Sequence, residues 1–207
     1  MIPKQKRLIQ EEIWKNRKET DHYWSSHLPR REWFAEEIIK MKVGSVYEVG
    51  CNNAKNLWCI KQIDKKNRIK VFGGLDVNTS AIKRARKEMP QGRFVDYSIY
   101  RLCSRDKYDV VFTSGVLLHI PSDQVKNIIK KMIQKASKWV ILMETPGPDS
   151  VENGPEELNP TKKIKPKIKI FHDYERIFRE LGYDDVEITV LGFGDRDSNR
   201  MIKVSVG

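Results

Sequence analysis

The sequence lacks the features of a membrane-spanning or secreted protein. No apolar run approaches the ~20 residues that cross a bilayer, and the charged N-terminal stretch has no signal-peptide core. The three cysteines, Cys51, Cys59 and Cys103, are odd in number and show no C-x-x-C spacing. This pattern is unlike a disulfide framework or a structural zinc site. We therefore expect reduced thiols, no metal, no membrane span and a cytoplasmic location.

Acidic residues are outnumbered by basic ones. The 207 residues contain 39 Lys and Arg against 28 Asp and Glu, a formal net charge of +11. Such an excess suits an anionic partner, which includes nucleic acid, a nucleotide-linked substrate and a membrane surface. The charge alone does not choose among these partners, and ordinary solvated lysines would give the same total. The length suits one α/β domain.

Hydrophobic periodicity predicts alternating strands and helices from residue 43 onward. The strands at 108–113 and 138–144 are continuously apolar, as expected of parallel strands that are covered on both faces. This alternation predicts an α/β fold with an open, mostly parallel sheet and helices on both faces, in which ligands bind at the carboxyl ends of strands. The predicted strands are 45–49, 70–76, 93–97, 108–113, 138–144, 185–191 and 201–206, and the predicted helices are 55–63, 79–88, 122–136 and 172–181.

Two segments stand apart from this alternation. Residues 1–42 show helical periodicity and predict an N-terminal helical cap, interrupted by a break at 19–32 that contains Ser25, Ser26 and Pro29. Residues 43–207 form the predicted main domain. Within it, residues 145–169 hold five of the nine prolines and predict a long irregular insertion, which is uncommon unless it serves as a binding loop or lid.

Glycines are missing from the turn in "VYEVGCNNAKNL". Its apolar strand runs into Gly50, where a dinucleotide-binding turn would read G-x-G-x-x-G, but Asn52 and Ala54 follow. The next strand nevertheless ends at Asp76, where a carboxylate can accept hydrogen bonds from a ribose diol. This combination predicts a ligand that has a ribose and an adenine but no pyrophosphate.

The stretches "VYEVGCNNAKNL", "GGLDVNTSAIKRAR", "YDVVFTSGVLLHIPSD" and "KWVILMETP" resemble the successive motifs of class I S-adenosylmethionine-dependent methyltransferases. The resemblance covers about residues 43–145 and implies a Rossmann-like sheet with S-adenosyl-L-methionine as cofactor. The first loop of that family usually reads E-x-G-C-G-x-G-x-N, so this chain departs at two glycines. Asn visits left-handed backbone conformations easily, and Ala54 keeps the loop small. The cofactor contacts that the resemblance implies are Glu48, Gly50, Cys51, Asn52, Ala54, Asn56, Asp76, Val77, Asp96, Ser98, Ile99, Ser114, Gly115 and Val116.

Three residues are candidates for a catalytic base. Methyl transfer from a sulfonium depends mainly on proximity and orientation, although a hydroxyl acceptor also benefits from a general base. His119 follows the fourth strand, Glu144 ends the fifth, and His172 follows the insertion. Each also has a structural interpretation: a wall of the cofactor pocket for His119, a strand-end cap for Glu144, and the start of a helix for His172.

Candidate substrate contacts come from the cap, the insertion and the segment after it. An aromatic or arginine side chain in the N-terminal break could meet the cofactor's carboxylate or the acceptor. The run "KKIKPKIK", residues 162–169, has five lysines and no acid, so it could attract an anionic acceptor. Solvated surface charge is the alternative for these groups. The candidates are Tyr23, Trp24, Arg30, Arg31, Lys165, Lys167 and Tyr174.

Three functions are compatible with these observations. "FTSGVLLHIPSDQ" after a "GCN" loop resembles small-molecule methylases of sugar biosynthesis, so we expect methylation of a small, anionic molecule, such as a sugar or sugar nucleotide, within polysaccharide biosynthesis. The charge suggests RNA methylation as an alternative, although neither an N-P-P-Y-like motif nor a Pro-Cys pair is present. The missing glycines suggest the third possibility, a non-catalytic binding protein.

Overall fold

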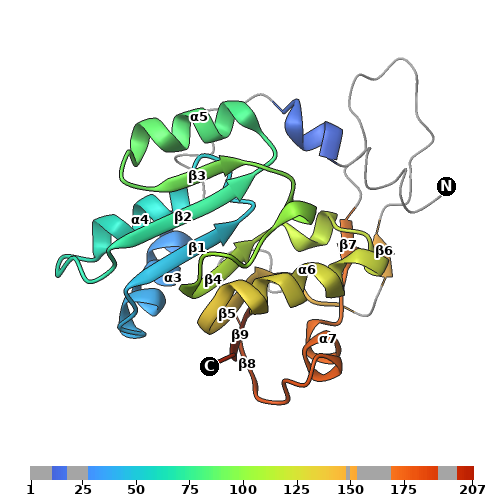
Figure 1. Ribbon diagram of the computed structural model, residues 1–207. Coiled ribbons are helices and arrows are strands. Elements are labelled where there is room, and N and C mark those ends of the chain that lie inside the picture. The colour runs from blue at the N-terminus through green and yellow to red at the C-terminus, as the bar shows by residue number, and fades with distance from the viewer. Residues whose placement is uncertain (1–10, 18–27, 148–149, 153–168, 191–199) are drawn as a thin grey trace.

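The computed structural model describes residues 11–17, 28–147, 150–152, 169–190 and 200–207, and its central feature is a seven-stranded sheet (Figure 1). Its strand order is β3-β2-β1-β4-β5-β9-β8. Strands β1 to β5 run parallel, and β9 and β8 continue the sheet antiparallel. The strands are β1 Ser45–Val49, β2 Val71–Asp76, β3 Arg93–Asp96, β4 Tyr108–Ser114, β5 Ala136–Glu144, β8 Val186–Val190 and β9 Arg200–Ser205.

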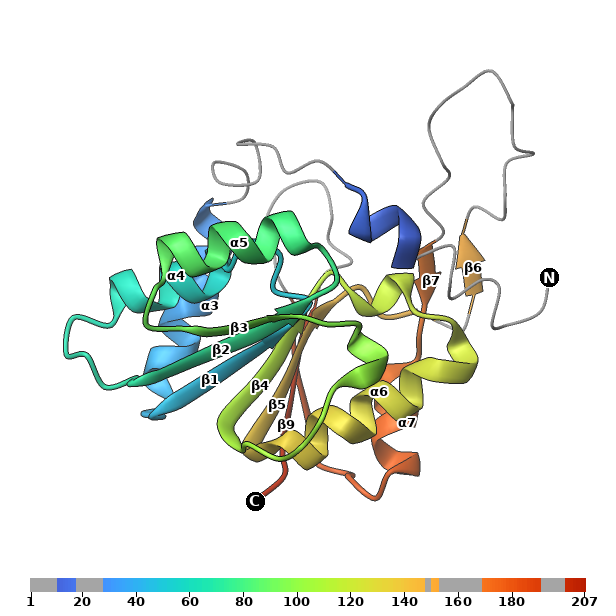
Figure 2. The same ribbon diagram turned by 45° about the horizontal axis from the view of Figure 1, so that its top comes forward.

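Helices cover both faces of the sheet, which confirms the predicted α/β fold. Helices α3, α4 and α5 pack on one face, and α6 and α7 pack on the other (Figure 2). Two short 3₁₀ turns, η1 and η2, follow β3 and β4. The bounds are α3 Leu28–Lys40, α4 Lys55–Ile63, α5 Thr79–Glu88, η1 Ile99–Arg101, η2 Leu117–His119, α6 Ser122–Lys135 and α7 Tyr174–Glu180.

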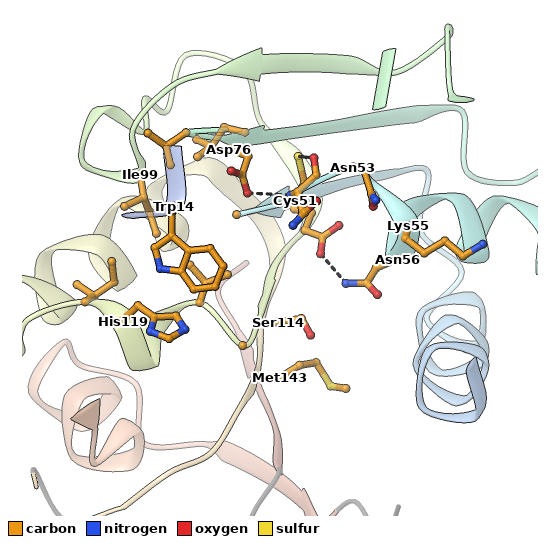
Figure 3. A pocket seen from close by; sticks show the side chains of 18 of the residues that line it. Trp14, Cys51, Asn53, Lys55, Asn56, Asp76, Ile99, Ser114, His119 and Met143 are labelled. Carbon is orange, nitrogen blue, oxygen red and sulfur yellow. Dashed lines mark hydrogen bonds between the residues drawn. The ribbon is translucent and has the colours of Figure 1, made fainter. Parts of the chain in front are cut away.

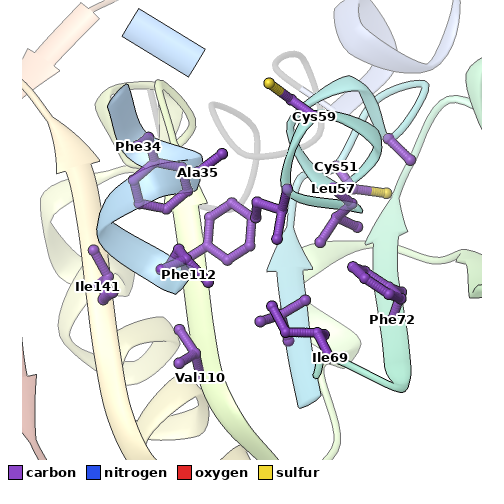
Figure 4. Packing of buried hydrophobic residues seen from close by; sticks show 14 of the residues in the cluster. Phe34, Ala35, Cys51, Leu57, Cys59, Ile69, Phe72, Val110, Phe112 and Ile141 are labelled. Atoms are coloured by element: carbon purple, nitrogen blue, oxygen red, sulfur yellow. The ribbon is translucent and has the colours of Figure 1, made fainter. Parts of the chain in front are cut away.

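The central strands bury side chains on both faces because adjacent residues of a strand point in opposite directions. Phe112 of β4 packs in the cluster under α3 and α4, with its ring 5.0 Å from that of Phe34 (Figure 4). Val111, its neighbour, packs in the cluster under α6 and α7. Two-sided burial explains why β4 reads as a continuous apolar run.

The N-terminal cap and the insertion differ from expectation. Helix α3 begins at Leu28, inside the predicted break, and Pro29 lies in its first turn, where a missing N–H breaks no helical bond. The insertion is not irregular throughout, because β6, Ser150–Glu152, pairs antiparallel with β7, Lys169–Phe171. The lysines Lys165 and Lys167 lie outside the described residues. No helix of the described ranges is long and apolar enough to cross a membrane.

Candidate active site

A cavity of about 240 Å³ lies at the carboxyl ends of the parallel strands. Its lining comes from the loops after β1, β2, β3 and β4 and from the end of β5, together with residues of α3 and of the segment 11–17 (Figure 3). The chain order of the sheet reverses between β1 and β4, and open α/β sheets bind ligands at such a switch point. The predicted site residues that line this cavity are Glu48, Gly50, Cys51, Asn52, Asn56, Asp76, Val77, Ile99, Ser114, Gly115, Val116, Arg30, Arg31 and His119.

The loop after β1 has a left-handed backbone at every second residue. Gly50, Asn52 and Ala54 have φ of 75°, 48° and 62°. Asn52 and Ala54 stand at the two positions where the methyltransferase motif has glycine, so the glycine conformation is kept although the glycines are absent. A Cβ on Gly50 would lie 2.5 Å from Cγ2 of Val116. Gly50 therefore also allows the loops after β1 and β4 to approach closely.

Asp76 joins the end of β2 to this loop. Its Oδ2 accepts a hydrogen bond from the backbone N–H of Asn52 at 2.8 Å, and its Oδ1 accepts one from that of Asn78 at 2.9 Å. Burial raises the pKa of this carboxyl above its ordinary value, and the backbone hydrogen bonds oppose that shift. Each oxygen keeps a second lone pair, so Asp76 can shape the loop and accept hydrogen bonds from a ligand.

A second carboxylate lies at the other end of the loop. Glu48 Oε1 accepts a hydrogen bond from Asn56 Nδ2 at 2.6 Å, and Asn56 Oδ1 accepts one from Arg31 Nε at 3.1 Å. Glu48 Oε2 is buried and has no hydrogen-bond partner among the described residues. Burial raises the pKa of Glu48 to about 8. Lys55 also lines the cavity. This end of the cavity therefore has one carboxyl group, that of Glu48, and two basic side chains, Arg31 and Lys55.

Residues 11–17 cover the other side of the cavity. The ring of Trp14 lies 4.7 Å from that of His119 (Figure 3). Asn78 holds this segment in place, because its Nδ2 donates to the carbonyl oxygens of Trp14 and Arg17 at 3.1 and 2.8 Å. Its Oδ1 accepts from Ala81 N and so caps α5. One amide therefore ties the cover to the start of a helix beside Asp76.

Two of the three candidate bases do not reach the cavity. Glu144 and His172 are fully buried and lie outside its lining. Glu144 Oε1 accepts hydrogen bonds from the backbone N–H groups of Val116 and Leu117, and His172 Nε2 lies 3.1 Å from two backbone oxygens, those of Leu117 and Ile120. Both side chains, which were predicted as bases, therefore contact the backbone around η2 and do not face the cavity. His119 alone of the three lines the cavity.

Other predicted contacts also lie elsewhere. Tyr174 is fully buried beside His172, with ring centroids 5.7 Å apart, and does not line the cavity. Ala54 is buried at the N-cap of α4. Asp96 forms an ion pair with Arg86 at 3.7 Å, and Ser98 Oγ accepts from Tyr100 N at 3.2 Å. Asp96 and Ser98 line a second hollow, which shares Glu11 and Val77 with the cavity, whereas Tyr23 and Trp24 lie outside the described residues.

Several lining residues were not predicted. Leu75 and Met143 directly precede strand-end residues that were singled out, so their place in the sequence could have indicated them. Trp14 and Glu11 belong to the helical pattern of the cap, and nothing in that pattern shows which cavity they cover. The unpredicted residues are Glu11, Trp14, Phe34, Asn53, Lys55, Leu75, Tyr100, Ile120 and Met143.

Comparisons with known proteins extend the description of the fold. No family model matches the chain, and no curated protein matches it. Among solved structures, it is similar to magnesium protoporphyrin IX methyltransferase from Synechocystis PCC 6803 with bound S-adenosylmethionine, at 14% identity over 98% of this chain and 97% of that one, with a TM-score of 0.64. It is also similar to CalS10, an amino pentose methyltransferase from Micromonospora echinaspora, at 10% identity over 91% and 98%, with a TM-score of 0.64.

A third similar structure is the S-adenosylmethionine-dependent methyltransferase SibL, at 19% identity over 89% of this chain and 56% of that one, with a TM-score of 0.66. These likenesses span nearly the whole chain at low identity. The protein therefore has the fold of class I S-adenosylmethionine-dependent methyltransferases, as the motifs predicted.

Proposed function

We propose that the protein is an S-adenosylmethionine-dependent methyltransferase that acts on a small, anionic acceptor such as a sugar or sugar nucleotide. One observation carries this proposal: a left-handed loop is tied by its backbone to Asp76 at the switch point of a methyltransferase fold. The loop retains this geometry without two of the family's glycines. This argues against a protein that keeps the fold but no longer binds the cofactor.

The donor groups of the cavity fit the cofactor's polar ends. The unpaired Glu48 Oε2 suits an ammonium, while Arg31 and Lys55 suit the adjoining carboxylate. Asp76 would accept hydrogen bonds from the ribose hydroxyls, with Val77 and Ile99 beside the adenine. When bound, the cofactor supplies an activated methyl group on a sulfonium. We call the loop 50–56 with Glu48, Asp76 and Val77 the cofactor side.

The remaining wall would receive the acceptor. We call residues 11–17, Ser114 to Ile120 and Met143 the acceptor side; Ser114, Gly115 and Val116, at its border with the loop after β1, are also the cofactor contacts that the resemblance implies. Arg30 donates to Met143 O at 3.3 Å and lines the cavity, so a cation stands close to this side. His119 is the candidate base, because its imidazole lines the acceptor side of the cavity. The chain's own contribution is then to orient the acceptor, exclude water through Trp14, and accept a proton.

The cover formed by residues 11–17 favours a small acceptor over a polymer. The similarity to an amino pentose methyltransferase supports a sugar, and we place the reaction within polysaccharide biosynthesis. Cys51 and Cys59 are buried as free thiols, which supports a cytoplasmic protein. We further propose that the lysines of 162–169, including Lys165 and Lys167, attract the anionic group. RNA methylation remains the alternative, for which the net charge of +11 is the argument.

The acceptor class is tested by methyl transfer from labelled S-adenosylmethionine into fractionated cell extract, half of which is treated with nuclease. We expect label in a small, anionic fraction that is resistant to nuclease. Label that disappears after nuclease treatment would establish RNA as the acceptor instead. Binding of the cofactor without label in any fraction would support the third interpretation, a binding protein.

A further inference from the structure

The turn that brings His119 to the cavity is held by side chains from elements far away in the sequence. Glu144, at the end of β5, accepts the N–H groups of Val116 and Leu117 at 2.9 and 3.2 Å through the same oxygen, Oε1. Amides at the start of a helical turn have no partner within the turn. A buried carboxylate therefore satisfies the donors at the N-terminal end of η2.

His172 satisfies the acceptors on the other side of the same turn. Its Nε2 lies 3.1 Å from Leu117 O and 3.1 Å from Ile120 O. Because a carbonyl oxygen can only accept, Nε2 must carry the hydrogen and donate it between these two oxygens. The turn is thus bound at its N–H groups by one side chain and at its C=O groups by another, so it cannot shift without breaking buried hydrogen bonds.

The backbone of His172 is itself held by the segment after β5. Its carbonyl oxygen accepts from Gly147 N and from Tyr174 N, each at 3.1 Å, and Pro146 forms a β-bridge with it. His172 directly follows β7, which pairs with β6 at the base of the insertion and packs against η2. The insertion and the turn that carries His119 are therefore joined through one imidazole.

We infer that His172 and Glu144 are positioning residues that fix His119 against Trp14 on the acceptor side of the cavity. This inference rests on the proposed function for the role of His119, but the contacts themselves do not. A reacting group displaced by about 1 Å can lose ~100-fold in rate. The two residues would thus affect turnover without touching the cofactor or the acceptor.

The experiment measures the position of His119 without requiring catalysis. Protein labelled with ¹³C at the histidine rings is saturated with S-adenosylhomocysteine, and the ring-proton shifts of His119 are recorded. The Trp14 ring, 4.7 Å away, should displace these shifts, and Trp14→Leu gives the undisplaced reference. We expect His172→Leu to lose most of the displacement, because Ile120 O loses the His172 donor and Leu117 O keeps only that of Ile120 N. His172→Gln, which keeps an N–H group on a side chain of similar reach, should retain it.

A matched control separates positioning from general destabilisation. Val204→Ala removes buried volume from the cluster that also contains Leu117, without touching a hydrogen bond of η2, and should leave the His119 shifts displaced. If His172→Leu does not fold, His172→Asn serves instead, since its shorter amide cannot span both oxygens. The inference is overturned if the displacement survives in His172→Leu or His172→Asn, or if Val204→Ala loses it equally.

A kinetic arm uses as acceptor the matching fraction of untreated extract, identified by the label that it takes up in the transfer assay. We expect His172→Leu to lower kcat by ~10-fold or more with unchanged S-adenosylhomocysteine affinity, and His172→Gln to restore most of it. Intact shifts in every His172 variant with no methyl transfer by wild type would refute both the positioning inference and the proposed function. Lost shifts in His172→Leu with no transfer would refute that function while leaving the positioning contacts established.

Discussion

The two sides of the cavity are built differently. The cofactor side comes from one continuous stretch, the loop 50–56, joined by hydrogen bonds to Asp76 and Glu48. The acceptor side comes from segments that lie far apart in the sequence, namely residues 11–17, the turn after β4 and Met143 of β5, and Glu144 and His172 hold that turn from outside the cavity. Local backbone geometry shapes the loop of the first, with one tertiary hydrogen bond to Asp76, whereas tertiary hydrogen bonds determine the second throughout.

Two buried carboxyls, Glu48 on the cofactor side and Glu144 behind the turn of the acceptor side, provide the largest expected effect. Burial raises the pKa of Glu48 to about 8 and that of Glu144 to about 7, both above 4.5. A raised carboxyl pKa contributes stability that is fully present below pH 4.5 and is lost as the pH rises to the folded value. Glu48→Gln should thus gain stability over wild type between pH 5 and 9, on the order of 4 kcal/mol, and Glu144→Gln should gain less and level off about one pH unit earlier.

Urea unfolding across this pH range checks the comparison. Glu180→Gln is the matched control, because Glu180 is exposed and its hydrogen bond with Lys126 lowers its pKa instead. It should show no gain with rising pH. If the difference in unfolding free energy between Glu48→Gln and wild type does not change with pH, Glu48 is solvated or paired. If Glu48→Gln and Glu144→Gln give the same pH dependence, the two carboxyls are equally perturbed by burial.

A smaller change in unfolding free energy tests the close contact between Gly50 on the cofactor side and Val116 on the acceptor side. Gly50→Ala would combine a strained φ with a contact of 2.5 Å to Val116, so we expect a loss of roughly 2–4 kcal/mol in unfolding free energy. Gly182→Ala has a φ of 87° but no neighbour within 4 Å, and should cost only about 1 kcal/mol. Val116→Ala should recover part of the loss in Gly50→Ala. Equal losses at both glycines would exclude the close approach of the two loops.

The smallest effect concerns the missing glycines. Asn52→Gly and Ala54→Gly should each relieve about 1–2 kcal/mol of left-handed strain, offset by the greater entropy of glycine in the unfolded chain, for a net gain of about 0.5–1 kcal/mol. Differential unfolding measures this gain, and calorimetry measures cofactor affinity. If Asn52→Gly weakens binding strongly while Ala54→Gly does not, the Asn52 amide contacts the ligand and strain is not its main role.

Features that depend on neighbouring residues could be predicted from the sequence, whereas contacts between distant segments could not. The bounds of β1, α4 and α5 match their predicted ranges, and Asn52 holds the left-handed backbone expected of it, because these features depend on neighbours in sequence. Glu144 and His172, which were predicted as bases, lie outside the cavity for a tertiary reason. Sequence position placed them near strand ends, but it could not show that both side chains point at the backbone around η2. Trp14 was missed for the same reason.

The central claim is that the cofactor binds through Asp76, and calorimetric titration with S-adenosylhomocysteine tests it most directly. Asp109→Ala is the control, because Asp109 also accepts a backbone N–H, that of Gly44 at 2.7 Å, but at the opposite end of the sheet from the cavity. We predict that wild type and Asp109→Ala bind alike and that Asp76→Ala binds more than ~10-fold more weakly. Unchanged affinity in Asp76→Ala, or no binding by wild type, would contradict the account.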